Sequence, residues 1–276
     1  LPELVREHGC DVAVSLDGDA DRLIMADANH VYNGDELLWA MVTDRLLDGA
    51  VSGVAGTLMT NFALEQKLAE RQIPFGRAKV GDRYVLEMMK REGWLLGGET
   101  SGHIIALDKQ TTGDGLVSAL QVLATMRRQE KTLAEVTAEL TLLPQVLVNR
   151  PIEPGFDWRK SEAFGAAVRE AEKTLEGRGR LLVRPSGTEP LLRIMVETAD
   201  PAEARRLAEE RTEAFPLGEG VEDDVVAGRE KVAEVFFGIG RRERVHLLAE
   251  FLAPETGFMR RACAAAVERP RDQRVD

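Results

Sequence analysis

Cysteine is scarce in this sequence, which has only Cys10 and Cys263 among 276 residues. Neither belongs to a CxxC pair or to a Cys/His spacing typical of zinc sites, so thiolate metal and redox chemistry are not indicated. The simplest expectation is a chain with reduced thiols in the cytoplasm. The sequence also has no apolar run near the roughly 18 residues of a membrane span and no signal peptide pattern, so no membrane partner is expected.

Positive charge is in deficit, with 36 Lys and Arg against 47 Asp and Glu and a net charge of −11. A broad nucleic-acid-binding surface is therefore not expected, and any phosphate group would need a local basic or backbone-lined pocket. The content of 44% hydrophobic and 30% charged residues is typical of a globular protein, and the length allows two or three domains. Because Leu1 is not a methionine and lies close to an apolar strand, we expect an N-terminal truncation.

Strand and helix patterns alternate in the first half of the chain, which predicts an α/β fold with a mainly parallel sheet. From residue 142 the order changes, and a small α+β domain is predicted over residues 146–215, with a Pro-containing linker around 149–155. Residues 216–276 fit neither domain and are predicted to form an unassigned tail with helices at 230–237 and 245–252. The other predicted strands are 12–16, 22–26, 51–58, 75–80, 94–97, 103–107, 145–149, 180–184 and 191–197, and the other helices are 37–46, 61–71, 83–91, 115–128, 133–140, 160–176 and 202–214.

A cluster of aspartates follows the first predicted strand, in the sequence DGDADR. Carboxylates at i, i+2 and i+4 in a tight loop can converge on one hard cation, so Asp17, Asp19 and Asp21 predict a Mg²⁺ or Ca²⁺ site. An EF-hand is excluded because its sixth position would be Arg22 and its twelfth Ala28. Arg22 could hold a phosphoryl oxygen beside the cation, whereas the alternative interpretation is an acidic, solvated turn.

A second motif, GGETSGH, lies at the end of a predicted strand, where glycines allow a sharp turn and a close approach of a ligand. Glu99 can accept and Ser101 can donate hydrogen bonds, which suits neighbouring sugar hydroxyls. His103 could bind the ligand or transfer a proton. The alternative is a plain β-turn followed by a strand.

A third motif, RPSGTEP, lies between two predicted strands of the α+β domain. The hydroxyls of Ser186 and Thr188, the amide of Gly187 and the guanidinium groups of Arg184 and Arg193 would make a phosphate site. The alternative is an ordinary hairpin turn with exposed arginines. Two further segments, KVGDR at 79–83 and TTGDG at 111–115, precede predicted helices and are explained equally well as anion-facing or as capping segments.

These motifs, in this order, resemble those of the α-D-phosphohexomutase superfamily, and their residue sequences are similar to those of the phosphoglucosamine mutase branch. The resemblance covers residues 1–215. It implies the end of domain two over 1–33 with metal ligands Asp17, Asp19 and Asp21, domain three over 34–145 with the sugar-binding residues Glu99, Ser101 and His103, and domain four over 146–215 with the phosphate loop. It places Arg22 on a phosphoryl group, and it places the family's phosphoserine in an upstream domain that has no match in this sequence.

The resemblance implies a Mg²⁺-dependent enzyme that interconverts glucosamine 6-phosphate and glucosamine 1-phosphate through a bisphosphate intermediate. It further implies a phosphorylated hexosamine as the bound partner, and it leaves a homodimer open. Without the phosphoserine, residues 1–276 alone are expected to be inactive. The alternatives are a phosphomannomutase/phosphoglucomutase fragment, a non-catalytic phosphosugar-binding module, and a phosphatase that uses an aspartate of the first loop.

Overall fold

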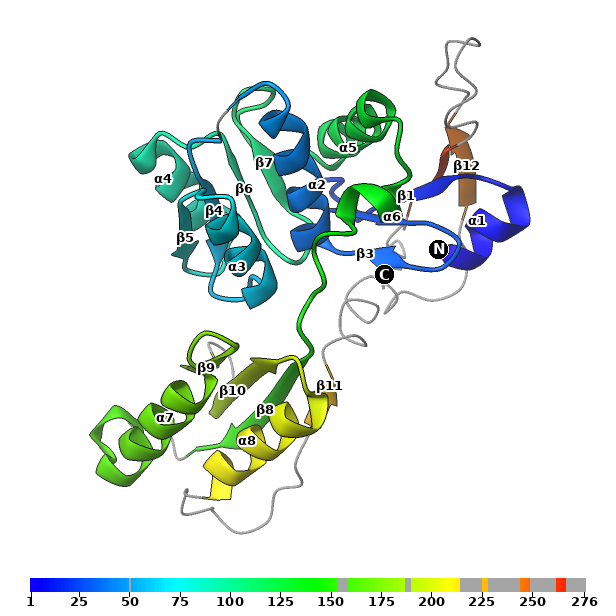
Figure 1. The fold of residues 1–276 in the computed structure, drawn as a ribbon. Coiled ribbons are helices and arrows are strands. Elements are labelled where there is room, and N and C mark those ends of the chain that lie inside the picture. The colour runs from blue at the N-terminus through cyan, green and yellow to red at the C-terminus, as the bar shows by residue number, and fades with distance from the viewer. Residues whose placement is uncertain are drawn as a thin grey trace, which may run out of the picture. The chain divides into compact units, whose positions relative to one another are not determined.

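The computed structural model describes residues 1–49, 51–152, 158–186 and 190–213, together with three short C-terminal strands (Figure 1). The chain divides into two compact units, of which the first comprises Leu1–Thr141 with Phe236–Asp276 and the second comprises Leu142–Val235. Within the described segments, no helix has the length and apolar character needed to cross a membrane.

The first unit contains a five-stranded sheet in the order β12-β13-β1-β2-β3. β1 pairs antiparallel with β2 and parallel with β13. Both β1 and β2 are short apolar runs and are almost entirely buried, as strands covered on both faces require. The turn between them carries the aspartate cluster. The elements are α1 (Pro2–His8), β1 (Val12–Leu16), β2 (Leu23–Ala26), β3 (Val31–Tyr32), β12 (Arg244–Leu248) and β13 (Ala262–Ala266).

Several features of this sheet differ from the sequence predictions. Residues 244–248 form a strand, whereas the sequence predicts a helix over 245–252. A segment this short shows too little periodicity to distinguish a helix from a strand, so pairing with β13 decides its conformation. The helix predicted at 230–237 lies outside the described residues. α1, β3 and β13 have no predicted counterpart. Cys10 is disulfide-bonded rather than reduced.

The long helix α2 (Gly34–Leu46) begins with a capping box, as its sequence allows. The side chain of Asn33 accepts hydrogen bonds from the amides of Asp35 and Glu36, and the carboxylate of Glu36 accepts the Asn33 amide at 2.9 Å. Every residue from Gly34 to Val42 is buried, because the helix contacts β2 and β3 as well as α5, α6 and β6. α2 therefore joins the two sheets of the first unit.

The second sheet of this unit has the order β5-β4-β6-β7, in which β4 is parallel to β5 and β6, and β7 is antiparallel to β6. This confirms the predicted α/β class with a mainly parallel sheet. The polar residues Thr60 and Asn61 each predict a cap for the helix that follows, and the structure assigns that role to Asn61, whose side chain accepts the Ala63 amide. The elements are β4 (Val54–Thr57), α3 (Phe62–Glu70), β5 (Phe75–Ala78), α4 (Asp82–Glu92), β6 (Leu96–Gly98), β7 (Ile104–Ala106), α5 (Gly115–Gln129) and α6 (Leu133–Thr137).

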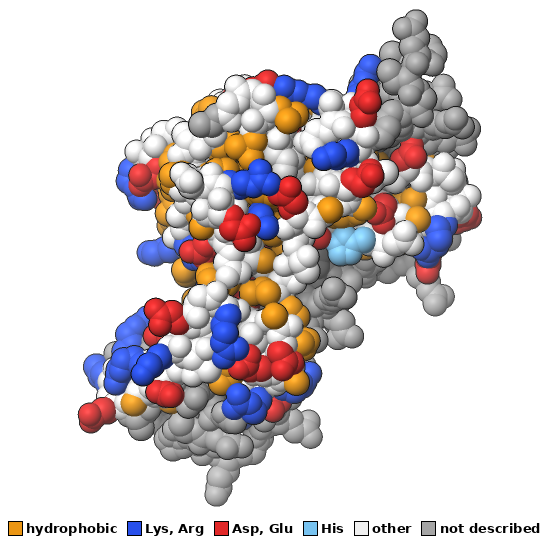
Figure 2. Space-filling view, in the orientation of Figure 1, with side chains coloured by type: hydrophobic (Ala, Val, Ile, Leu, Met, Phe, Trp, Pro, Cys, Tyr) orange, Lys and Arg blue, Asp and Glu red, His pale blue; other side chains and the backbone are white. Residues whose placement is uncertain are grey.

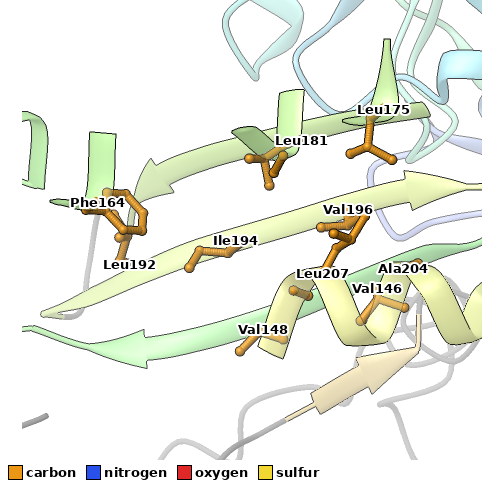
Figure 3. Packing of buried hydrophobic residues seen from close by; sticks show 12 residues of the cluster. Val146, Val148, Phe164, Leu175, Leu181, Leu192, Ile194, Val196, Ala204 and Leu207 are labelled. Carbon is orange, nitrogen blue, oxygen red and sulfur yellow. The ribbon is translucent and has the colours of Figure 1, made fainter. Parts of the chain in front are cut away.

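The second unit is an antiparallel sheet in the order β11-β8-β10-β9, with helices packed on one face. Alternate residues of the strands enter a single core with both long helices, and Figure 3 shows Leu192, Ile194 and Val196 of β10 in it. The opposite face of the sheet carries the other alternate residues of these strands, among them Arg180 and Glu197 as well as the apolar Leu182 and Met195. The elements are β8 (Gln145–Pro151), the 3-10 helix η1 (Trp158–Lys160), α7 (Glu162–Leu175), β9 (Gly179–Pro185), β10 (Leu191–Thr198), α8 (Pro201–Glu213) and β11 (Val225–Ala227).

The charged side chains of the described surface are mixed in sign. On the face shown in Figure 2, small groups of Lys and Arg lie among groups of Asp and Glu. Several of these groups form ion pairs, such as Arg45 with Asp108 at 3.0 Å and Arg178 with Glu203 at 2.7 Å.

Candidate active site

The aspartate loop connects the end of β1 to the start of β2. Its turn is closed by a hydrogen bond from the Ala20 amide to the Asp17 carbonyl at 3.1 Å, with Ala20 at a φ of 58°. The carboxylate of Asp17 accepts the backbone amide of Arg22 at 3.3 Å, and the two side chains approach to 3.9 Å. The loop is thus built around Asp17, and Arg22 lies beside it.

Asp21 faces the sugar-loop histidine. The Nδ1 atom of His103 lies 3.1 Å from Oδ2 of Asp21, and the imidazole is 5% exposed. Burial raises the pKa of Asp21, but hydrogen bonds with His103 and Asp17 and the charges of His103 and Arg22 outweigh it, so the pKa lies below its usual value. The carboxylate therefore remains ionised, as a metal ligand must be.

The donor chemistry of this loop suits Mg²⁺, which prefers carboxylate oxygens. Asp17 and Asp21 already contact one another, whereas Asp19 is exposed. Over the described part of the chain, no three His, Cys, Asp or Glu side chains lie close enough together to hold a metal. The residues fit the ion in type, and two of the three sequence-predicted ligands are adjacent in this structure.

The second motif is the turn from β6 to β7. It is closed by hydrogen bonds from the Glu99 amide to the His103 carbonyl and from the Gly102 amide to the Glu99 carbonyl. Oε1 of Glu99 accepts the amide of Gly81 at 2.8 Å, which anchors the loop to the start of α4. Among the described residues, Oε2 of Glu99 and the hydroxyl of Ser101 make no hydrogen bond, so both remain available to a ligand.

A buried carboxylate that the sequence interpretation missed holds the same loop. Asp35 is 1% exposed, and its Oδ2 lies 2.9 Å from both the Thr100 hydroxyl and the Asn61 amide. The Gly34 amide also donates to the Thr100 carbonyl at 3.0 Å. The only sequence signal was an acidic residue in the first turn of a helix, which is common for reasons unrelated to function.

Gly102 lets the loop lie directly on β2. Its carbonyl accepts the Leu23 amide at 3.0 Å, and a Cβ at this position would come within 2.1 Å of the Leu23 carbonyl oxygen. Gly102 also has a φ of 94°, which residues with a Cβ rarely adopt. The third glycine of the motif is therefore required by the contact between the two loops.

The TTGDG segment caps α5 and also touches both loops. The carboxylate of Asp114 accepts the Val117 amide as the N-cap, and the Gly115 amide donates to the Ala20 carbonyl at 2.9 Å. A Cβ on Gly113 would lie 2.0 Å from Nε2 of His103, so only glycine fits there. The starts of α2, α4 and α5 therefore each contact the sugar loop or the aspartate loop.

The third motif lies in the second unit, at the turn from β9 to β10. Arg184 and Arg193 are paired across these strands, and burial followed by the charge of Arg193 lowers the pKa of Arg184. Within the described residues, the Ser186 hydroxyl oxygen is buried without a hydrogen-bond partner. Gly187 and Thr188 lie outside the described residues. The structure thus brings together three of the five predicted phosphate-binding residues.

Two family models match the chain. Residues 33–142 match the phosphoglucomutase/phosphomannomutase α/β/α domain III, and residues 147–214 match the C-terminal domain of the same family. Together they account for more than half of the 276 residues.

Similar curated proteins are named phosphoglucosamine mutase. That of Methylibium petroleiphilum is 56% identical over 225 residues, which is 78% of this chain and 49% of the relative. That of Ralstonia nicotianae is 54% identical over 212 residues, or 76% of this chain and 47% of the relative. The chain spans about half the length of the curated relatives that it matches.

Similar solved structures share the fold. The Aspergillus fumigatus N-acetylphosphoglucosamine mutase, crystallised with GlcNAc-6P and magnesium, has a TM-score of 0.60 at 24% identity and matches 73% of this chain and 51% of that one. A phosphoglucomutase/phosphomannomutase family protein of Burkholderia thailandensis has a TM-score of 0.60 at 18% identity, over 78% of this chain and 50% of that one.

Proposed function

Because the chain belongs to the phosphoglucomutase/phosphomannomutase family, we propose that residues 1–215 are the C-terminal part of a phosphoglucosamine mutase that interconverts glucosamine 6-phosphate and glucosamine 1-phosphate. The curated relatives at more than half identity support this substrate. The observation that carries the proposal is the meeting of the aspartate loop and the sugar loop through His103 and Asp21. One ligand could contact both loops.

The sugar loop would hold the hexosamine ring. One carboxylate oxygen of Glu99 accepts the Gly81 amide, which restrains the side chain. The other carboxylate oxygen would therefore be held in place to accept a hydrogen bond from the ligand. With the hydroxyl of Ser101, it offers an acceptor and a donor for adjacent ring hydroxyls. Such a pair can bind the ring in two orientations, which a mutase requires because each end of the sugar must reach the phosphoryl donor.

The aspartate loop would hold Mg²⁺ through Asp17, Asp19 and Asp21. When bound, the ion would offset the negative charge of the phosphoryl group in transfer. His103 lies against the carboxylate of Asp21, and Arg22, beside Asp17, would bind a phosphoryl oxygen. The Aspergillus relative crystallised with magnesium supports the choice of ion.

The second unit would bind the phosphate group that is not being transferred. Arg184 and Arg193 provide two cations, Ser186 provides a hydroxyl, and Gly187 and Thr188 complete the predicted loop. Charge-assisted hydrogen bonds from planar guanidinium groups suit a phosphate dianion better than lysines would. The like charges of the two arginines also favour an anion between them.

Finer expectations follow from the same proposal. The phosphoserine that donates the phosphoryl group would belong to a part of the enzyme outside residues 1–276, and the protein would be a cytoplasmic isomerase that supplies amino-sugar nucleotide and peptidoglycan precursors. The second candidate is a phosphomannomutase/phosphoglucomutase, which the family models support equally well because their description covers those activities.

Turnover assays would test the proposal. Residues 1–276 alone should not convert glucosamine 6-phosphate, whereas fusion to the N-terminal half of the Methylibium phosphoglucosamine mutase should restore turnover. Glu99→Gln in the fusion should lower kcat/KM by about tenfold or more, because it removes a charged acceptor for ring hydroxyls. Glu172→Gln, on the exposed side of α7, is the matched control. Preference of the fusion for mannose or glucose phosphates would favour the second candidate, and turnover by residues 1–276 alone would contradict the assignment of the phosphoryl donor.

A further inference from the structure

The start of α4 lies against the sugar loop at two points. Oε1 of Glu99 accepts the backbone amide of Gly81 at 2.8 Å. Nε2 of His103 lies 4.0 Å from Oδ2 of Asp82, which is the first residue of the helix. These two contacts place the carboxylate of Asp82 beside the groups that would hold the sugar ring.

The basic neighbours of Asp82 are directed at other partners. Nε of Arg83 donates to Oε1 of Glu87, one turn further along the helix, at 2.8 Å. Nζ of Lys79 lies over the ring of Tyr84, 5.6 Å from its centroid. Among the described residues, no lysine or arginine lies within ion-pair distance of Asp82, whose side chain is 59% exposed. A cationic group of a ligand could therefore reach this carboxylate without displacing a cation of the protein.

The buried imidazole of His103 is also directed at Asp82. Its Nδ1 faces the ionised carboxylate of Asp21, whereas Nε2, on the other side of the ring, is shielded from solvent and makes no hydrogen bond within the described part of the chain. The 4.0 Å between Nε2 and Asp82 exceeds hydrogen-bond length, so a further polar group is needed to complete this contact. An acidic residue that only stabilises the start of a helix would not need a buried polar atom directed at it.

We propose that Asp82 binds the C2 ammonium group of a hexosamine phosphate and so selects amino sugars over neutral hexoses. The inference rests on the proposed function and names a specificity-determining residue for it. The carboxylate would accept a charge-assisted hydrogen bond from the ammonium, which is stronger than a bond from a C2 hydroxyl. The same negative charge repels the phosphate of every sugar phosphate, and only an amino sugar carries a cation that offsets this repulsion.

Asp82→Asn tests the inference, because it removes the charge with almost no change in shape. Glucosamine 6-phosphate and glucose 6-phosphate would be titrated separately into the full chain by calorimetry, at low ionic strength and about pH 7, where the amine is protonated and the phosphate is mostly a dianion. The unmodified chain should prefer the amino sugar at least about fivefold, and Asp82→Asn should reduce this preference to within about twofold. Glu92→Gln, at the other end of α4, removes the same charge and should keep the preference.

The pH provides a second test that needs no variant. At about pH 9.5 the sugar amine is neutral, as an α-amino group would be, so the preference of the unmodified chain should also fall to within about twofold. A preference that survives at this pH, or in Asp82→Asn, overturns the inference. The comparison of the two pH values decides the question by itself if Asp82→Asn does not fold.

The same titrations separate this inference from the proposed function. If the unmodified chain binds both sugar phosphates equally at pH 7, Asp82 does not select the amine, whereas phosphosugar binding stands. If the unmodified chain binds neither of them, both proposals fail.

Discussion

The Nδ1 atom of His103 lies 3.1 Å from Oδ2 of Asp21, although 82 positions separate the two residues in the chain. This contact links the last residue of the sugar-loop motif to the aspartate loop. Since the imidazole is 5% exposed, it acts inside the protein, where it holds a carboxylate in place. The two loops are therefore expected to respond together when either is altered.

Replacing His103 should affect both loops. His103→Ala should lower the free energy of unfolding by about 1–3 kcal/mol, because a buried hydrogen bond to a carboxylate is lost. It should also weaken Mg²⁺ binding, because Asp21 loses the group that orients it. Urea unfolding and Mg²⁺ calorimetry would measure the two effects, with His8→Ala in α1 as the control. A destabilised variant with unchanged Mg²⁺ affinity would show that His103 serves packing alone.

Mg²⁺ binding should depend on the exposed member of the aspartate loop. Asp19→Ala should abolish the thermal stabilisation caused by Mg²⁺ while leaving the metal-free melting temperature within about 2 °C of the original, since exposed substitutions cost little. The same titration with Asp200→Ala, in the second unit, provides the control. Equal responses to Mg²⁺ by Asp19→Ala and the unmodified chain would contradict the metal assignment.

Gly102 and Gly93 form a matched pair for testing the docking of the sugar loop. Both have positive φ values, of 94° and 70°, but a Cβ on Gly102 would meet the Leu23 carbonyl, whereas one on Gly93 would meet no atom within 4 Å. Gly93→Ala should therefore cost only the left-handed strain of about 1–2 kcal/mol. Gly102→Ala should cost about 3 kcal/mol or more, because backbone atoms must move. Similar losses in chemical denaturation would argue against tight docking.

The buried carboxylate of Asp35 should make Thr100 important for stability. Thr100→Val keeps the shape of the side chain but removes the hydroxyl 2.9 Å from Oδ2 of Asp35. Removing one partner of a buried hydrogen bond costs about 1–3 kcal/mol, so a loss of that size is expected. Thr111→Val, at an exposed position of the next loop, should change the unfolding free energy by less than about 0.5 kcal/mol. Equal effects would show that the contact carries no particular energy.

Acid should release the ion pair between Asp108 and Arg45. Burial raises the pKa of Asp108, but hydrogen bonds and charges of Arg45 and Lys109 outweigh it, so the folded pKa lies below 3.8. Stability from this group is therefore present above that value and is lost as the pH falls through the lower folded pKa. Asp108→Asn should lower the unfolding free energy by about 0.5–1 kcal/mol at pH 7 and by progressively less in acid. A pH-independent effect would contradict this linkage.

Local sequence patterns determined much of this protein. Apolar runs of four or five residues predicted β1 and β2, and periodicity predicted α2. The polar residues Thr60 and Asn61 each predicted a helix cap, and the structure assigns that role to Asn61. The three motifs could be found because each gathers its chemistry within about ten residues or fewer. Within so short a segment, the hydrogen-bonding groups, the charges and the backbone freedom of glycine can all be read directly from the sequence.

Only the tertiary structure decided which distant groups meet. Asp35 could not be distinguished from an ordinary acidic residue at the start of a helix until Thr100 and the Asn61 amide were found against it. The strand at 244–248 was mistaken for a helix because its pairing partner, not its own sequence, selects its conformation. Contacts between residues far apart in the chain leave no periodic signal, since they depend on how whole elements pack.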